Sequence, residues 1–153
     1  MSRDYLRDYS TEAFKLYAKN GSLEKYKEKL YEEIIASEGK GTGISNPTEA
    51  QLIKKEKILI DKKASLDDME AVEKTLKEFS VSNPFTVMII SEVYFIRPNE
   101  EQYKGYIQDR VIAAAIKLNV DTRTIYRHLK NARTVFSINR GLRVESEERR
   151  EKK

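Results

Sequence analysis

Apolar residues recur along most of this chain at spacings of three and four, the period of an amphipathic helix. Two such helices are expected over residues 3–36, because Asn20-Gly21 interrupts the pattern and Ser22 can cap the second helix. The apolar positions are Tyr5, Leu6, Tyr9, Ala13, Leu16 and Tyr17 in the first helix and Leu23, Tyr26, Leu30, Tyr31, Ile34 and Ile35 in the second. The tyrosines favour helix packing or a dimer seam over contact with nucleic acid.

Two more helices are expected in the middle of the chain, before the segment that begins at Asn83. Pro47 suits the first position of a helix that reaches Ile60, with Ser45 or Asn46 as its N-cap. Another is expected to begin at Ser65 and stop near Ser80, with Met69, Val72, Leu76 and Phe79 on its apolar stripe.

The segment that opens on Asn83-Pro84 contains the most apolar run, PFTVMIISEVYF, whose composition alone also permits a strand. The capping pair favours a helix, with Asn83 as N-cap and Pro84 as first residue. Its inward positions are expected to be Phe85, Met88, Ile89, Glu92 and either Tyr94 or Phe95. Arg97-Pro98-Asn99 should end this helix.

Residues 111–136 predict two helices joined by a tight turn. In the first, the inward phase is set by Gln108, Ile112, Ala115 and Ile116. Asn119 can adopt the left-handed backbone of the turn, and Asp121 can cap the second helix, which is expected over 121–133. The inward residues of that second helix are Ile125, Leu129, Ala132 and Phe136. The single histidine, His128, is expected to pack against the first of these helices.

The outer face of the second helix carries side chains suited to DNA. Arginine can bond the major-groove edge of guanine through two parallel hydrogen bonds, and lysine can neutralise a phosphate. The residues expected to contact DNA are Thr122, Arg123, Thr124, Tyr126, Arg127, Lys130, Asn131 and Arg133. A basic but merely solvated helix face is the alternative.

The distribution of charge favours the DNA interpretation. Residues 104–143 contain nine basic and two acidic residues, a net charge of +7, whereas residues 1–103 carry 16 basic and 19 acidic residues, a net charge of −3. The positive charge is therefore concentrated around the candidate reading helix.

The segment AAAIKLNVDTRTIYRHLKNAR resembles the helix-turn-helix of sigma factor region 4 and of phage regulators of the RinA and ArpU type. The matching positions are Ala115, Asn119, Val120, Asp121, Thr124, Ile125, Tyr126 and Arg127. The loop and helix start GKGTGISNPTEA and a short tail helix over 136–142 are similar to further RinA-like features. The resemblance implies a phage or prophage regulator that controls late genes.

The sequence contains few residues suited to catalysis, metal binding or nucleotide binding. The chain has no Cys and one His, and it shows no zinc spacing or nucleophile with a base, so no enzyme, cofactor or metal is expected. The loop GKGTG lacks the spacing of a nucleotide P-loop and is interpreted as a flexible joint, with phosphate contact by Lys40 as a weaker reading. No apolar run could span a membrane, and a cytoplasmic location is expected.

The predicted organisation is all-α, with a helical arm over 1–63 jointed at 39–46, a DNA-binding helix-turn-helix domain over 64–143, and a disordered charged tail over 144–153. The expected partner is double-stranded DNA, with RNA polymerase and a second copy of the chain as further candidates. Two alternatives stay open. One is a small terminase or other packaging subunit, and the other is a sigma-like module that binds polymerase without its own DNA specificity.

Overall fold

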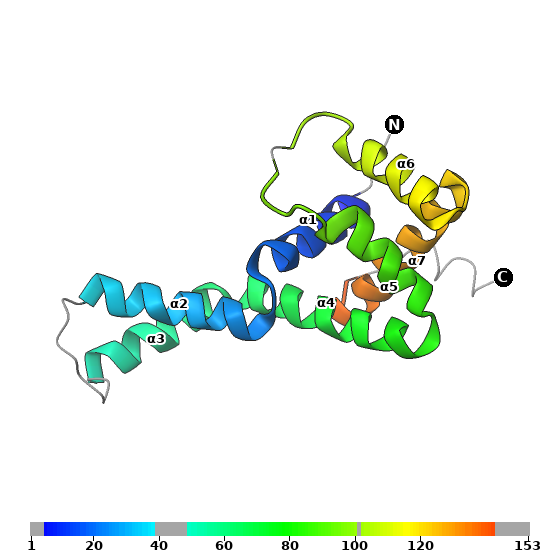
Figure 1. Ribbon diagram of the computed structural model, residues 1–153. Coiled ribbons are helices and arrows are strands. Elements are labelled where there is room, and N and C mark those ends of the chain that lie inside the picture. Colours follow the sequence, from blue (N-terminus) through cyan, green and yellow to red (C-terminus); the bar gives the residue numbers. More distant parts are fainter. Residues whose placement is uncertain (1–4, 39–48, 101, 143–153) are drawn as a thin grey trace.

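The computed structural model describes residues 5–38, 49–100 and 102–142, with the side chains of 34–38, 51 and 55 excepted. These ranges are helical and contain no strand, which confirms the all-α expectation. The elements are α1 (Tyr5–Asn20), α2 (Leu23–Glu38), α3 (Glu49–Asp61), α4 (Lys63–Ser82), α5 (Pro84–Ile90), the π-helical turn η1 (Ser91–Phe95), α6 (Tyr106–Leu118) and α7 (Thr122–Arg140) (Figure 1). The Gly-rich joint, the cap at Ser45 or Asn46, Pro47 and the charged tail lie outside the described residues.

Helices α2 and α3 lie side by side and project as a hairpin from a bundle formed by the other helices (Figure 1). The break between α1 and α2 is as predicted, since Gly21 has φ +86° and Ser22 Oγ accepts the backbone N–H of Lys25 at 3.1 Å. The arm expected over 1–63 is nevertheless divided. Helix α1 packs in the bundle, so only the α2–α3 hairpin projects.

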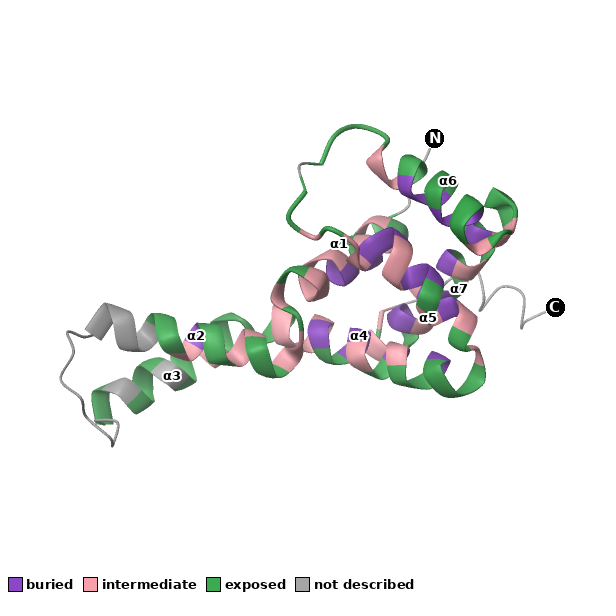
Figure 2. Cartoon of the chain, in the orientation of Figure 1, coloured by how far each residue is buried: buried purple, intermediate pink, exposed green. Residues whose placement is uncertain are grey.

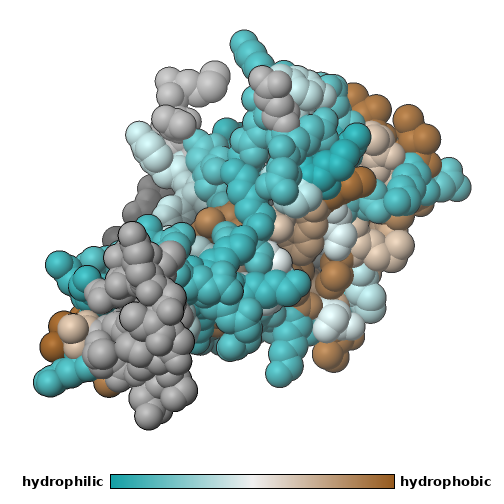
Figure 3. All heavy atoms as spheres, turned by 60° about the vertical axis from the view of Figure 1, so that its left-hand side comes forward, coloured by the Kyte–Doolittle hydropathy of each residue, from teal (hydrophilic) through white to brown (hydrophobic). Residues whose placement is uncertain are grey.

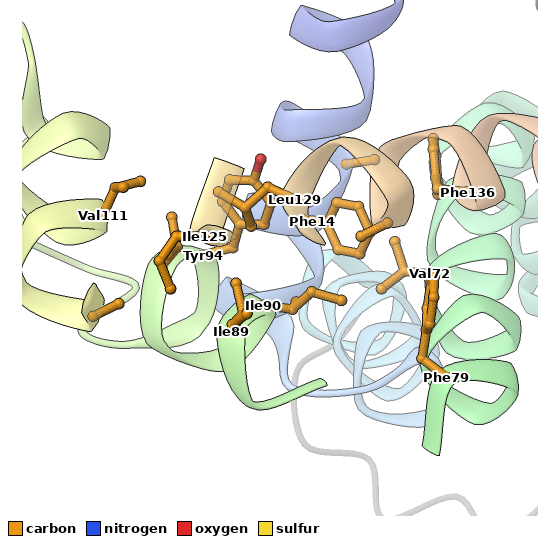
Figure 4. Close-up of a cluster of buried hydrophobic side chains, with 14 of the residues drawn as sticks. Phe14, Val72, Phe79, Ile89, Ile90, Tyr94, Val111, Ile125, Leu129 and Phe136 are labelled. Carbon is orange, nitrogen blue, oxygen red and sulfur yellow. The ribbon is translucent and has the colours of Figure 1, made fainter. Parts of the chain in front are cut away.

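Helix α1 belongs to the bundle because Phe14, absent from the predicted apolar stripe, is fully buried. Its ring lies 5.3 Å from the ring of Tyr94 and 5.6 Å from that of Phe136, so side chains of α1, η1 and α7 meet (Figure 4). Tyr5, assigned to the stripe, is 73% exposed. The end of the helix at Asn20 was predicted correctly. Its inward face was predicted in part, since Ala13 is buried and Tyr17 packs against the core, but Phe14 was missed.

Polar contacts also join α1 to α4 and α7. The hydroxyls of Ser10 and Ser137 lie 3.2 Å apart in a buried hydrogen bond between α1 and α7. Asp68 of α4 accepts the hydroxyl of Tyr9 at 2.6 Å and Nε of Arg140 at 2.7 Å. One carboxylate thus joins α1, α4 and α7.

Helix α4 begins earlier than predicted, at Lys63, directly after a turn at Lys62 that makes no side-chain cap. Ser65, the predicted start, lies inside the helix, because the preceding Lys and Ala residues are good helix formers. Met69, Val72 and Phe79 are buried as expected, and Leu76 packs at the edge of the core.

The apolar run after Asn83 is helical, with Pro84 as its first residue, but the Asn83 side chain makes no cap hydrogen bond. The inward face agrees with the prediction only in part. Ile89 and Tyr94 are buried as expected, but Met88 is 50% exposed and Phe85 is half-buried. The other buried residues, Thr86, Ile90 and Val93, were not predicted. The run is apolar on nearly every side, so no polar stripe marked its outer face, and the π-helical turn shifts the phase further.

Glu73 of α4 fixes the base of the projecting hairpin. Its Oε2 accepts the hydroxyl of Tyr17 at 2.9 Å and the backbone N–H of Leu23 at 3.1 Å. Burial and then the Glu73 carboxylate raise the pKa of Tyr17 to about 12, from an ordinary value of 10.0.

This pKa predicts a loss of stability in alkali. Between pH 10 and 12 the unfolded chain releases the Tyr17 proton while the folded chain keeps it, so the free energy of unfolding should fall as pH rises through that window. In Tyr17→Phe the free energy of unfolding should fall less steeply with pH. Glu73→Gln removes the neighbouring charge and should also reduce this pH dependence. Urea denaturation at pH 9, 10 and 11 measures the free energy of unfolding of each variant. An identical fall in wild type and Tyr17→Phe would contradict the assignment.

Candidate nucleic-acid interface

Helices α6 and α7 are joined by a turn of three residues, Asn119 to Asp121. Asn119 has φ +57° and ψ +49°, which confirms the expected left-handed conformation. The turn closes by two backbone hydrogen bonds, from Asn119 N–H to Ile116 O at 3.3 Å and from Val120 N–H to Ala115 O at 3.0 Å. A turn of this length and conformation is typical of a helix-turn-helix.

Asp121 caps α7 as predicted. Its Oδ1 accepts the backbone N–H of Thr124 at 2.8 Å. This backbone bond, followed by a hydrogen bond from the Thr124 side chain, lowers the pKa of Asp121 below its ordinary value. The carboxylate therefore stays charged at the positive end of the helix dipole, and Thr124 is held at the helix start.

The inner face of α7 is also as expected, because Ile125, Leu129, Ala132 and Phe136 are all buried. The helix is longer than 121–133, and it ends at Arg140 before Gly141, which has φ +83°. The separate tail helix expected over 136–142 is thus the last part of α7. No helix breaker lies between Arg133 and Arg140, and Phe136 and Ser137 are buried.

Six of the eight residues expected to contact DNA share the exposed side of α7. They are Thr122, Arg123, Tyr126, Arg127, Lys130 and Asn131. The other two are half-buried: Thr124 is engaged with the Asp121 cap, and Arg133 donates from Nη1 to the hydroxyl of Tyr94 at 3.1 Å. The exposed surface available to a partner is therefore concentrated on residues 122–131.

The structure divides the cations of this region into two groups. Arg110, Lys117 and Arg140 bind Val93 O at 3.0 Å, Glu92 at 2.7 Å and Asp68 at 2.7 Å, respectively. Within the described ranges, no hydrogen bond or ion pair involves Arg123, Arg127 or Lys130, and all three are exposed. The first turns of α7 thus present three exposed cations that have no hydrogen bond or ion pair within the described residues.

The inward phase of α6 was wrong. Gln108, Ile112 and Ile116 are exposed, whereas Val111 and Ala114 are buried along with the expected Ala115. The helix is apolar on both sides, so periodicity alone could not choose between the two phases.

His128 packs against α5, not against α6 as expected. Its Nδ1 lies 2.8 Å from Oγ1 of Thr86, and its ring meets that of Phe85 edge-on at 5.3 Å. Burial and then the charge of Arg127 lower the pKa of His128 below its ordinary value. The histidine is therefore a packing residue at the α5–α7 contact.

Helix α1 borders the candidate interface, and no pattern in the sequence predicts this position. A groove of about 530 Å³ lies between α1, α6 and α7, and its lining includes Arg7, Thr11, Ile107, Tyr126 and Arg133. Arg7 and Tyr126 are more than a hundred positions apart in the chain, and only the tertiary packing of α1 against α7 brings them to one groove.

The described residues contain no group of three His, Cys, Asp or Glu side chains placed to hold a metal ion. Among the described helices, none combines the length and apolar character that crossing a membrane requires. No protein-family model, curated protein or solved structure matches the chain.

Proposed function

We propose that this chain is a sequence-specific DNA-binding protein that places the N-terminal half of α7 in the major groove. The observation that carries the proposal is the set of unpaired cations, Arg123, Arg127 and Lys130, on one exposed face directly after the turn that joins α6 and α7. A helix whose first turns project toward base edges is how helix-turn-helix proteins read DNA.

Each exposed side chain has a role in this proposal. Arg123 and Arg127 can form paired hydrogen bonds to guanine, and Asn131 can do the same with adenine. Lys130 contacts phosphate, and Thr122 and Tyr126 each bond a phosphate or a base edge. Arg133 can contact DNA only if its hydrogen bond to the Tyr94 hydroxyl breaks. It is therefore assigned to the edge of the DNA contact.

The regulatory role rests on the resemblance of residues 113–133 to RinA and ArpU regulators and to sigma region 4. On that basis the protein is a cytoplasmic transcriptional regulator of the phage or prophage type, and RNA polymerase is a second partner. Its double-stranded DNA target would lie near a promoter.

Selection of random duplex DNA on the purified full-length protein tests the proposal directly, followed by affinity measurements across salt concentration. An enriched motif with affinity that falls steeply with salt is the expected result. Weak, salt-sensitive binding without enrichment would contradict sequence-specific reading and favour a packaging or polymerase-binding role. A ring of many subunits in solution would favour packaging.

Arg127→Ala should weaken binding to the selected motif by about 1–3 kcal/mol and relax the preference at one base position. Lys130→Ala should instead weaken binding to all sequences alike and make the affinity less dependent on salt. Lys77→Ala, which removes an exposed cation of α4, is the control and should leave affinity unchanged. Equal, small effects from the Arg127 and Lys130 variants would remove the major-groove assignment.

A further inference from the structure

Helix α6 has a second apolar stripe that the fold leaves uncovered. Its inner residues pack in the core, while Ile112 is 44% and Ile116 is 77% exposed on the opposite side. Asp109, Ala113 and Lys117 lie on the same outer side and are also exposed. Figure 2 shows both buried and exposed segments along α6. Residues 109, 112, 113 and 116 have the spacing of a helix–helix contact stripe. Side chains of high hydropathy gather on the side of the molecule away from the α2–α3 hairpin (Figure 3).

We propose that this outer face of α6 pairs with the same face of a second copy of the chain, antiparallel and centred on Ala113. The small side chain at the centre lets two helices approach closely. Ile112 and Ile116 of each copy would then flank Ala113 of the other. A helix that is apolar on both sides is normally covered on both sides, and the core covers one side of α6.

The charges at the ends of the stripe select a second copy as the occupant. Asp109 and Lys117 lie four residues before and four residues after Ala113. Antiparallel pairing about Ala113 places Asp109 of each copy opposite Lys117 of the other, so the surface is its own complement, as a twofold interface requires. Asp109 already accepts the hydroxyl of Tyr103 at 2.6 Å, and Lys117 lies 2.7 Å from Glu92. Both groups keep unused hydrogen-bonding capacity for a partner.

The contact is expected to be reversible. A single helix of 13 residues offers less than the roughly 800 Å² per partner of a standard stable interface. The protein should therefore exchange between monomer and dimer with concentration. This pairing is independent of the proposed DNA reading, since it uses α6 residues and its measurement needs no DNA.

Disulfide trapping tests the centre of the pairing, because the chain contains no Cys and a single substitution supplies the only thiol. Helix axes 8–10 Å apart would bring the two Ala113 Cα atoms to about 3.4–5.4 Å, and the upper part of this range overlaps the separation that a disulfide spans. Ala113→Cys should therefore form a covalent dimer rapidly under mild oxidation. Lys77→Cys, exposed on α4, is the matched control and should react much more slowly. Equal rates for the two variants would overturn the proposal.

Charge exchange tests the direction of the pairing. Asp109→Lys and Lys117→Asp should each weaken self-association about tenfold, because each places two like-charged pairs across the twofold axis. An equimolar mixture of the two variants restores both opposite-charge pairs, so it should associate about as well as the wild type. Loss of the internal Lys117–Glu92 contact cannot produce this recovery. A mixture no tighter than either variant alone would overturn the antiparallel arrangement.

Sedimentation of the full-length chain measures how much the apolar side chains of the α6 face contribute to dimerisation. Wild type should shift from the 17.8 kDa monomer toward twice that mass as concentration rises. Ile116→Glu should remain monomeric and folded, because Ile116 is exposed in the monomer. Val81→Glu changes a residue of α4 that is 84% exposed and should dimerise like the wild type. A wild type that stays monomeric at millimolar concentration, or equal behaviour of the two variants, would reject the interface.

Discussion

Phe14→Ala is expected to lower the free energy of unfolding by about 3–5 kcal/mol, the largest effect of any substitution in α1. Phe14 is fully buried, and its ring contacts those of Tyr94, Phe136 and Phe95, at centroid distances of 5.3, 5.6 and 6.5 Å. Truncation removes the ring from the point where α1, η1 and α7 meet. The surrounding helices are fixed by other contacts, so a cavity would remain.

Urea denaturation of the full-length chain measures this loss. Val81→Ala is the matched control, because it also removes apolar atoms but at a position that is 84% exposed, and it should change stability by less than about 0.5 kcal/mol. If α1 were part of an independent arm, Phe14→Ala would leave the main unfolding transition in place. That outcome would contradict the position of α1 in the core.

Arg110→Ala is expected to lower the free energy of unfolding by about 3 kcal/mol. Arg110 is a buried cation of α6 that donates from Nη1 to Val93 O at 3.0 Å and from Nη2 to Arg97 O at 3.1 Å. Its guanidinium also lies 5.3 Å from the centroid of the Tyr106 ring and 3.6 Å from Glu100. Removing it leaves two carbonyl groups without their donor where η1 ends.

The bond to Arg97 O joins a residue whose backbone has φ +46°, a conformation that costs a non-glycine residue about 1 kcal/mol. Hydrogen exchange in residues 96–100 should therefore accelerate in Arg110→Ala. Arg110→Lys should recover less than half of the lost stability, because an ammonium cannot match the two-pronged geometry of the guanidinium. Lys104→Ala removes an exposed cation and should have little effect. If lysine restored all of the lost stability, the positive charge alone, and not the paired guanidinium donors, would account for the contribution of Arg110.

Several features that depend on neighbouring residues were predicted from the sequence, although the expected Asn83 cap forms no side-chain hydrogen bond. The left-handed Asn119, the Asp121 cap and the break at Gly21 each follow from chemistry within four residues. The inner face of α7 was also correct, because its polar and apolar positions alternate clearly at the helical period. Strong local signals of this kind survive whatever the helix later packs against.

Features that depend on distant residues were not predicted. Nothing near Arg110, Lys117 or Arg140 reveals partners that lie 17, 25 and 72 positions away. The sequence therefore overstated how much of the local positive charge is available to DNA. The inward faces of α5 and α6 were predicted only in part, for a related reason. Both helices are apolar on more than one side, and only the tertiary structure decides which side is covered.

The pairing of α1 with α7 has a consequence for synthesis of the protein. Ser10 and Ser137, which bond one another, are separated by 127 residues. Since a ribosome adds about 5–20 residues per second, Phe14 must wait on the order of ten seconds before its α7 partners exist. Helix α1 therefore leaves the ribosome while the ring of Phe14 is still exposed to solvent. The bundle can close only after α7 has been synthesised, so chaperones have access to α1 throughout that interval.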